Sequence, residues 1–152
     1  MPDPGTDIPL PPHAYVPGQN ARHPEDWFDG IKASVTPETP PHLLHHTRAW
    51  RAGLAYLEVG YYWECHEVLE AVWMQAPNPS PEREMTQAII QLANALLKLK
   101  MAKPNAARRL AEMVWAHLAR CPADQPILGV RVDWMSMQVN ALVRKVDEIS
   151  AL

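Results

Sequence analysis

The stretch GYYWECHEVLEAVWM, Gly60 to Met74, places one histidine and three glutamates among aromatic and aliphatic residues. Its apolar periodicity predicts a helix over roughly residues 61–75, so the ionisable groups lie on or beside a face that is normally buried. Burying an unpaired charge costs several kcal/mol. The sequence therefore indicates a polar site on this helix, and its residue types limit the chemistry that the site can perform.

Helical spacing groups the ionisable residues of this stretch. At about 100° per residue, His66, Glu67 and Glu70 share one broad face at the aromatic edge of the apolar side. Glu64 points the opposite way, and we expect it to be solvated. His66, Glu67 and Glu70 are therefore the candidates for the site, and each of them needs a hydrogen-bonding partner from another element.

A second helix supplies candidate partners. Gln87, Gln91, Asn94 and Lys98 are spaced 4, 3 and 4 residues apart, which makes a polar seam along an otherwise apolar helix. An amide offers two donors, whereas an ionised glutamate only accepts. We expect the charged face of the first helix to meet the seam formed by Gln87, Gln91 and Asn94. We also expect the segment near His23 to close over the open end of this cluster.

The first hypothesis for this cluster is a metal site. His66 and Glu70 stand one helical turn apart, a spacing at which imidazole and carboxylate can bind one divalent metal, and helical bundles hold such sites. The sequence offers few further ligands. A divalent metal is therefore a candidate cofactor with an incomplete ligand set.

The second hypothesis is a small-molecule pocket, with enzymatic activity left open. Glu67 or Glu70 would act as general base and His66 as its proton partner, while Trp63 and Trp73 form the walls. Together with the seam residues, these side chains form the candidate ligand-binding set.

The third hypothesis is structural: the cluster is a hydrogen-bonded network that sets the register of the helices. The protein would then be a non-catalytic interaction or dimerisation module. Trp134 and Met137 are candidates for a homodimer contact. A water-filled concavity at Glu67 and Glu70 would favour the pocket, whereas a closed cluster and a flat apolar patch elsewhere would favour the module.

Hydrophobic periodicity and capping residues predict the elements that position these groups. Gly60 is a candidate left-handed cap, Ser80 a candidate N-cap before Pro81, and Asp133 a candidate N-cap of the last helix. The predicted helices span roughly 42–58, 61–75, 81–101, 105–119 and 133 to the C-terminus. No strand pattern appears. Short connections favour antiparallel neighbours, so the predicted fold is all-α, a mainly up-and-down bundle of about five helices.

Residues 1–41 differ from the rest of the chain. They hold ten of the sixteen prolines, which forbid helix interiors and predict an extended arm with a short helical turn around EDWFDGIK. The arm also carries aromatic and aliphatic residues, in which a disordered tail is normally poor. We expect residues 1–41 to pack on a single bundle domain formed by residues 42–152.

Composition narrows the function classes. The formal net charge is −3 and the pI is near 6.1, which give no general attraction to nucleic acid or to anionic membranes. The apolar runs are shorter than the ~20 residues that span a bilayer, and the N-terminus lacks a secretory signal pattern. We therefore expect a soluble cytoplasmic protein in which Cys65 and Cys121 are free thiols.

The segments GYYWECHEVLEAVW and AIIQLANALLKLKMAKPNAARRLAEM together resemble DUF309, a bacterial and plastid family of unknown function. Its hallmark is a glycine-aromatic turn leading into an H-E-x-x-E-x-x-W helix, and His66, Glu67, Glu70 and Trp73 match these positions. The resemblance covers about Trp50 to Leu118, and the YVPG and RHP of the arm look like those of longer members. It implies a small helical bundle without an established activity.

Overall fold

In the computed structural model, residues 8–152 are described, and their regular structure is helical. The elements are α1 (Asp29–Lys32), the 3₁₀ helix η1 (Pro41–His46), α2 (Arg48–Val59), α3 (Tyr62–Gln75), α4 (Pro81–Lys100), α5 (Pro104–Leu118) and α6 (Val132–Ser150). Within this range the one β pairing is an isolated bridge between Ile127 and Val130. The predicted all-α class is confirmed, with five long helices and two short ones.

Local capping sets the boundaries of the helices. The predicted helix over 42–58 is divided at Thr47, whose extended backbone and side chain cap α2 by accepting from the Trp50 N–H. Gly60 ends α2 with φ of 87°, in the left-handed region that a residue without Cβ adopts without strain. Ser80 caps α4 by accepting from the Arg83 N–H, and Pro81 takes the first helical position, both as predicted.

The start of α6 differs from the prediction. The helix begins at Val132, after Arg131 in the extended N-cap position, and Asp133 lies inside the first turn. The Asp133 carboxylate accepts from the backbone N–H of Trp134, its direct neighbour, instead of reaching a residue two or three positions ahead. A carboxylate in the first turn also interacts favourably with the helix dipole. An acidic residue at the start of a helix therefore fits either the N-cap or the first turn.

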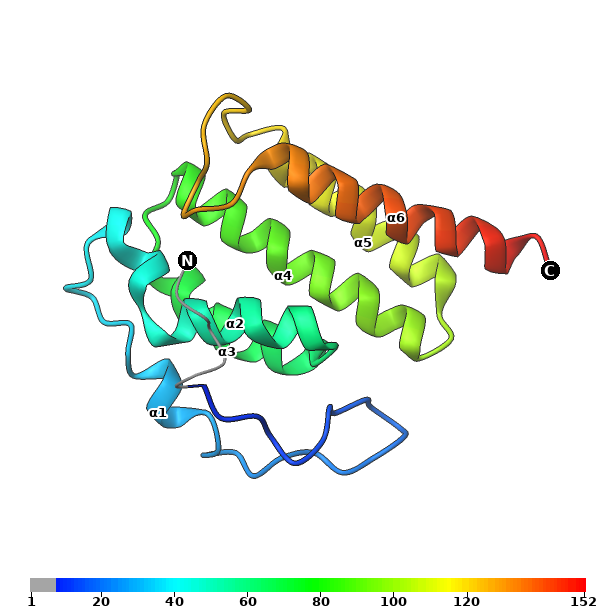
Figure 1. The fold of residues 1–152 in the computed structure, drawn as a ribbon, viewed down its shortest axis with the longest axis horizontal. Helices are drawn as coiled ribbons and strands as arrows, with labels where there is room; N and C mark the ends of the chain where they lie inside the picture. The colour runs from blue at the N-terminus through cyan, green and yellow to red at the C-terminus, as the bar shows by residue number, and fades with distance from the viewer. Residues whose placement is uncertain (1–7) are drawn as a thin grey trace.

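The long helices pack around α4. Figure 1 shows α4 running through the middle, with α2 and α3 on one side and α5 and α6 on the other. This central position agrees with contacts of α4 to α3, α5 and α6, and with its many buried residues. The largest fully buried apolar side chains are Tyr56, Phe28, Leu44, Leu69, Met85, Ile89, Leu92, Met135 and Leu142.

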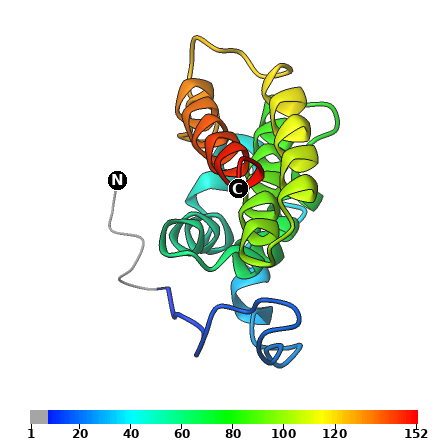
Figure 2. The same cartoon turned by 90° about the vertical axis from the view of Figure 1, so that its right-hand side faces the viewer.

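Residues 8–40 run along the α2–α3 side of the bundle. Figures 1 and 2 both place this segment at the end of the molecule opposite α6. It buries Ile8, Val16, Phe28, Ile31 and Val35. Polar contacts also reach α2: the Tyr56 hydroxyl donates to the Pro9 carbonyl at 2.7 Å, and the Ala49 N–H donates to Ser34 Oγ at 2.9 Å. This segment supplies one side of the candidate site.

Across the described helices, none combines the length and the apolar character that crossing a membrane requires.

Candidate functional site

The most deeply buried carboxylate of the 60–74 stretch is Glu64, with a relative exposure of 0%. The expectation that Glu64 is solvated is therefore wrong. A helical wheel of α3 alone shows Glu64 away from the bundle, but residues 8–40 cover this face. Glu64 lies in the first turn of α3, where the helix dipole stabilises a negative charge.

Two groups from the arm hold the Glu64 carboxylate. Oε2 accepts from the backbone N–H of Tyr15 at 2.7 Å and lies 2.6 Å from His23 Nε2. His23 is itself only 5% exposed, so the pair is buried on both sides. The other oxygen, Oε1, is buried and has no hydrogen-bond partner among the described protein atoms. The carboxylate therefore keeps unused capacity to accept a hydrogen bond.

Aromatic rings enclose this pair. The His23 ring centroid lies 4.7 Å from that of His13, 5.7 Å from Phe28 and 6.1 Å from Trp63. Such walls exclude water from the pair. Two neighbouring ionisable groups, Cys65 and Tyr56, are buried as well. Burial raises the pKa of the Cys65 thiol and of the Tyr56 hydroxyl, and the negative charge of Glu64 adds to both shifts.

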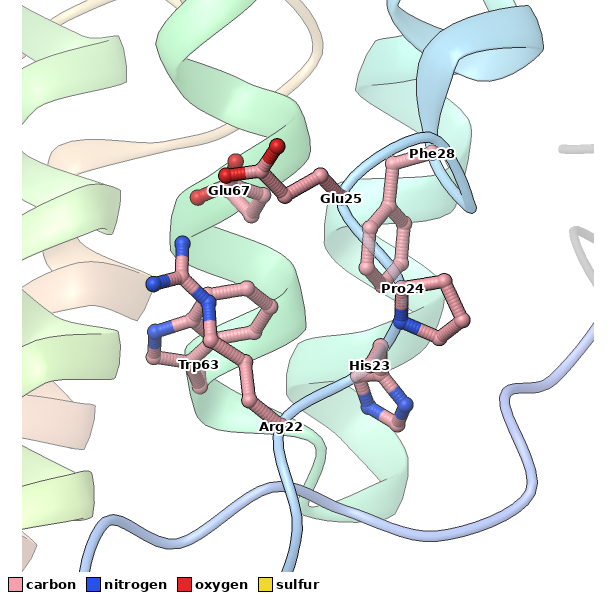
Figure 3. Close-up of a pocket in the computed structure, with 7 residues that line it drawn as sticks. All are labelled: Arg22, His23, Pro24, Glu25, Phe28, Trp63 and Glu67. Carbon is pink, nitrogen blue, oxygen red and sulfur yellow. The ribbon is translucent and has the colours of Figure 1, made fainter.

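A pocket opens beside the pair. It has a volume of about 190 Å³ and lies between the arm and α3. Figure 3 shows its lining: Arg22, His23, Pro24, Glu25 and Phe28 come from the arm and α1 region, and Trp63 and Glu67 from α3. The pocket thus joins aromatic walls to several polar and charged groups, as small-molecule sites commonly do.

The charged groups of the pocket differ in their pairing. Glu67 Oε1 accepts from Lys32 Nζ at 2.5 Å, so its charge is matched by a cation from α1. The Arg22 guanidinium lies over the Trp63 ring, with Cζ 5.4 Å from the ring centroid. Glu25 is exposed at the rim. Of the predicted catalytic candidates, Glu67 is the one that lines this pocket.

The other two candidates lie on the surface of α3. His66 Nε2 is 2.8 Å from Glu70 Oε1, one helical turn away, and the Glu70 side chain is 52% exposed. The structure thus pairs these residues with each other. An imidazole and a carboxylate that contact each other at the solvent-exposed surface need no third partner to be stable.

The predicted partner seam is also half-buried. Gln87, Gln91 and Asn94 are intermediate in exposure, and the Asn94 amide donates to Gln91 Oε1 at 3.3 Å. Among residues 8–152, no hydrogen bond joins the seam to His66, Glu67 or Glu70. The acceptor that Glu67 offers is taken instead by Lys32, a residue outside the two helices that sequence reasoning compared.

Trp73, the second predicted wall, lies outside the pocket. It is covered by Arg83, whose Cζ is 3.9 Å from the ring centroid and whose guanidinium also donates to the Trp73 carbonyl. The two tryptophans of α3 are thus each capped by an arginine, and Trp63 is the one that lines the pocket.

The geometry of potential metal ligands bears on the metal hypothesis. In the part of the chain that the structure describes, no group of three or more His, Cys, Asp or Glu residues is placed to hold a metal ion. His66 and Glu70 by themselves provide two ligands, fewer than structural or catalytic sites normally use.

Sequence reasoning missed Glu64, Arg22, Glu25 and Lys32, and it gave His23 only the role of closing an open end. One signal was available: the arm contains an Arg-His-Pro triplet among aromatic residues, at positions 22–24. The partners of these residues are 41 and 35 positions away in the chain, so no local spacing could connect them.

The buried pair can support proton transfer. A carboxylate that holds Nε2 of an imidazole orients the ring and fixes which nitrogen is free. Nε2 is taken by Glu64, so a proton transfer would have to use the opposite nitrogen, Nδ1. This arrangement resembles the base and orienting acid of hydrolytic sites, but the pocket lining contains no serine, threonine or cysteine nucleophile.

Comparison with known proteins gives one family-model match and no activity. Residues 50–110 match the family model described as "Domain of unknown function (DUF309)". The predicted resemblance is confirmed by this match. Searches of curated proteins and of solved structures found no match.

Proposed function

Residues 50–110 match the DUF309 model, and we propose that the protein binds a small polar organic molecule in the pocket between residues 22–25 and α3. His23, which is bonded to the buried Glu64, forms its polar floor, and Trp63 and Phe28 supply apolar contact. In this proposal the arm is part of the binding site, because five of the seven lining residues precede residue 29.

The observation that carries the proposal is that His23 belongs both to the pocket lining and to a buried hydrogen-bonded pair with Glu64. Burying a carboxylate is costly, and an apolar side chain of similar volume would often be at least as stable. A paired imidazole placed against an open concavity is the arrangement that binding and catalytic sites use. The unpartnered Oε1 of Glu64 adds a second reason, since buried acceptors are nearly always satisfied.

A thermal-shift screen with two matched variants tests the proposal. The purified full chain is screened against a set of polar metabolites that includes amino acids, nucleosides, sugar phosphates and organic acids. A compound that binds only the native state raises Tm by mass action. Trp63→Leu removes the pocket wall, and Trp73→Leu is the control, because Trp73 is a half-buried, arginine-covered tryptophan on the same helix.

We expect compounds that raise Tm of the wild type and of Trp73→Leu but not of Trp63→Leu. Each variant is compared with its own unliganded Tm, so a change in basal stability does not enter the comparison. The proposal is contradicted if no compound in the set raises Tm, or if every compound that does so acts equally on the two variants.

A second candidate function is self-association through α6. Trp134 and Met137 stand one turn apart on this helix, with exposed fractions of 43% and 66%. Large apolar side chains exposed together are typical of association surfaces. A homodimer by this route is tested by sedimentation equilibrium: Met137→Lys should lower the average mass, and a wild-type monomer at high micromolar concentration would contradict the idea.

A further inference from the structure

We infer that the molecule bound in the arm–α3 pocket is a small zwitterion of amino-acid type, whose carboxylate meets Arg22 and whose ammonium group meets Glu25. The inference rests on the proposed function, because it names the ligand class of the same pocket. It follows from which charges at the pocket are already paired and which are not.

Arg22 is the free cation of the pocket. Its guanidinium is held over the Trp63 ring, and among residues 8–152 it has no ion pair or hydrogen bond. Stacking on an aromatic face leaves the edge of the guanidinium, with its N–H donors, available to a ligand. The planar fork of donors matches a carboxylate, which it can bind through two parallel hydrogen bonds.

Glu25 is the free anion. It is exposed, lines the same pocket and has no ion pair or hydrogen bond among the described residues. In Figure 3 the Glu25 carboxylate and the Arg22 guanidinium both extend toward Glu67. A carboxylate in this position accepts hydrogen bonds from an ammonium group.

The remaining charges are already matched. Lys32 is bound to Glu67, and His23 is bound to Glu64. A ligand with one charge would satisfy Arg22 or Glu25 and would place the same charge near the other residue, where it is repelled. A ligand that carries both charges satisfies both residues and leaves the net charge of the pocket unchanged.

Size and walls agree with this class. A volume of about 190 Å³ suits a molecule of a few to about a dozen heavy atoms. Trp63, Phe28 and Pro24 offer apolar surface to the side chain of such a molecule. The charged groups are exposed, so the polar head is recognised at the rim and the side chain lies against the accessible surface of Trp63 and Pro24.

The test compares four forms of the same compounds by isothermal titration calorimetry. Amino acids with small, aliphatic and aromatic side chains are titrated as free amino acids, as N-acetyl derivatives, as amides and as N-acetyl amides. These forms carry both charges, only the negative charge, only the positive charge and no charge. We expect at least one free amino acid to bind at least tenfold more tightly than its three derivatives.

Two charge-removing variants assign the groups. Arg22→Gln should make the free amino acid bind no better than its amide, because the partner of the carboxylate is gone. Glu25→Gln should make it bind no better than its N-acetyl derivative. Both side chains are exposed, so the fold tolerates either change. Glu70→Gln, an exposed glutamate of α3 outside the pocket, is the control and should bind as the wild type does.

The outcomes separate this inference from the function on which it rests. The inference is overturned if an amide or an N-acetyl derivative binds as tightly as the free amino acid. It is also overturned if no amino acid binds while other polar compounds still raise Tm in a Trp63-dependent way, a result that would leave the proposed function intact. If no compound of either set binds, both proposals fail.

Discussion

Glu64 illustrates how a single buried carboxylate can connect distant parts of a chain. Its Oε2 accepts from Tyr15, 49 residues earlier, and contacts His23, 41 residues earlier. Both donors would lose their acceptor if the carboxylate were absent, and the buried His23 would be left without a partner. The residue therefore acts as an anchor for the arm and holds His23, which lines the pocket.

The anchoring role gives a stability prediction. Glu64→Ala should lower the free energy of unfolding by about 1–3 kcal/mol, since the Tyr15 N–H and the His23 imidazole lose their acceptor. Glu70→Ala, which removes an exposed carboxylate from the same helix, should change it by no more than about 0.5 kcal/mol. Urea denaturation followed by circular dichroism measures both. Equal effects would show that Glu64 is not an anchor.

Cys121 gives a pH dependence. Burial raises the pKa of its thiol from 9.0 to about 11, and the negative charges of Glu84 and Glu82 add to the shift. The unfolded chain releases this proton near pH 9, whereas the folded chain keeps it until about pH 11. The stabilising contribution is therefore complete below pH 9 and is lost as the pH rises through 11.

The corresponding measurement compares wild type with Cys121→Ala. The loss of unfolding free energy between about pH 8 and about pH 10.5 should be smaller in the variant by about 1–2 kcal/mol. Cys65, Tyr56 and Tyr62, whose pKa values are also raised by burial, remain in both proteins and contribute to the loss that persists. Identical pH profiles would contradict the assignment to Cys121.

At the scale of elements, the approach of α2 to α3 depends on a glycine. A Cβ placed on Gly53 would lie 2.5 Å from Leu69 Cγ, well inside van der Waals contact. Leu69 is fully buried, so it has little room to move away. The two helices therefore pack closely enough to bring the start of α3, with Trp63 and Glu64, against the arm.

A double-mutant cycle tests this contact. Gly53→Ala should destabilise the protein, because the overpacking cost of about 1–3 kcal/mol exceeds the gain of helix propensity of up to about 1 kcal/mol. Leu69→Ala alone should cost about 2–5 kcal/mol by opening a cavity. In the double variant the new methyl group occupies part of this cavity.

The cost of Leu69→Ala should therefore be at least about 1 kcal/mol smaller in the Gly53→Ala background than in the wild type. Thermal or urea unfolding of the four proteins gives the coupling. Additive effects would show that the two residues do not share this space. Gly30→Ala is a suitable control, since a Cβ there meets no atom within 4 Å.

For the whole molecule, the arm determines whether a pocket exists. Residues 22–25 and Phe28 form one side of it, and the bundle forms the other. The arm is tied down at several points, among them Gln19 to the Lys100 carbonyl at 3.0 Å and Lys32 to Glu67. Release of the arm would expose Trp63 and the buried carboxylate of Glu64 together.

Limited proteolysis measures how firmly the arm is held. Trypsin should cut slowly after Arg22 and Lys32 in the wild type, and faster in Glu64→Ala, because losing the buried anchor lowers the free energy of local opening. Glu70→Ala should be cut at the wild-type rate. If trypsin instead removes residues 1–22 from the wild type rapidly and Tm does not fall, these residues are not firmly held and contribute nothing to stability.

The sequence by itself determined the helical class and most helix ends, because these depend on periodicity and on capping groups that act within one turn. Gly60, Ser80 and Pro81 are local signals of this kind, and the structure follows them. The same kind of reasoning also located the helix that carries the site and the family to which residues 50–110 are matched.

Only the tertiary structure decided which of the three glutamates of α3 is buried. A helical wheel assigns the inner face from the residues of one helix, and it placed Glu64 outside because the apolar side lies opposite. The arm reverses this assignment: it brings Tyr15 and His23 over the outer face and supplies Lys32 to Glu67. Burial is a property of everything that covers a surface, and here the covering segment lies tens of residues away in the chain, beyond the reach of any periodic pattern.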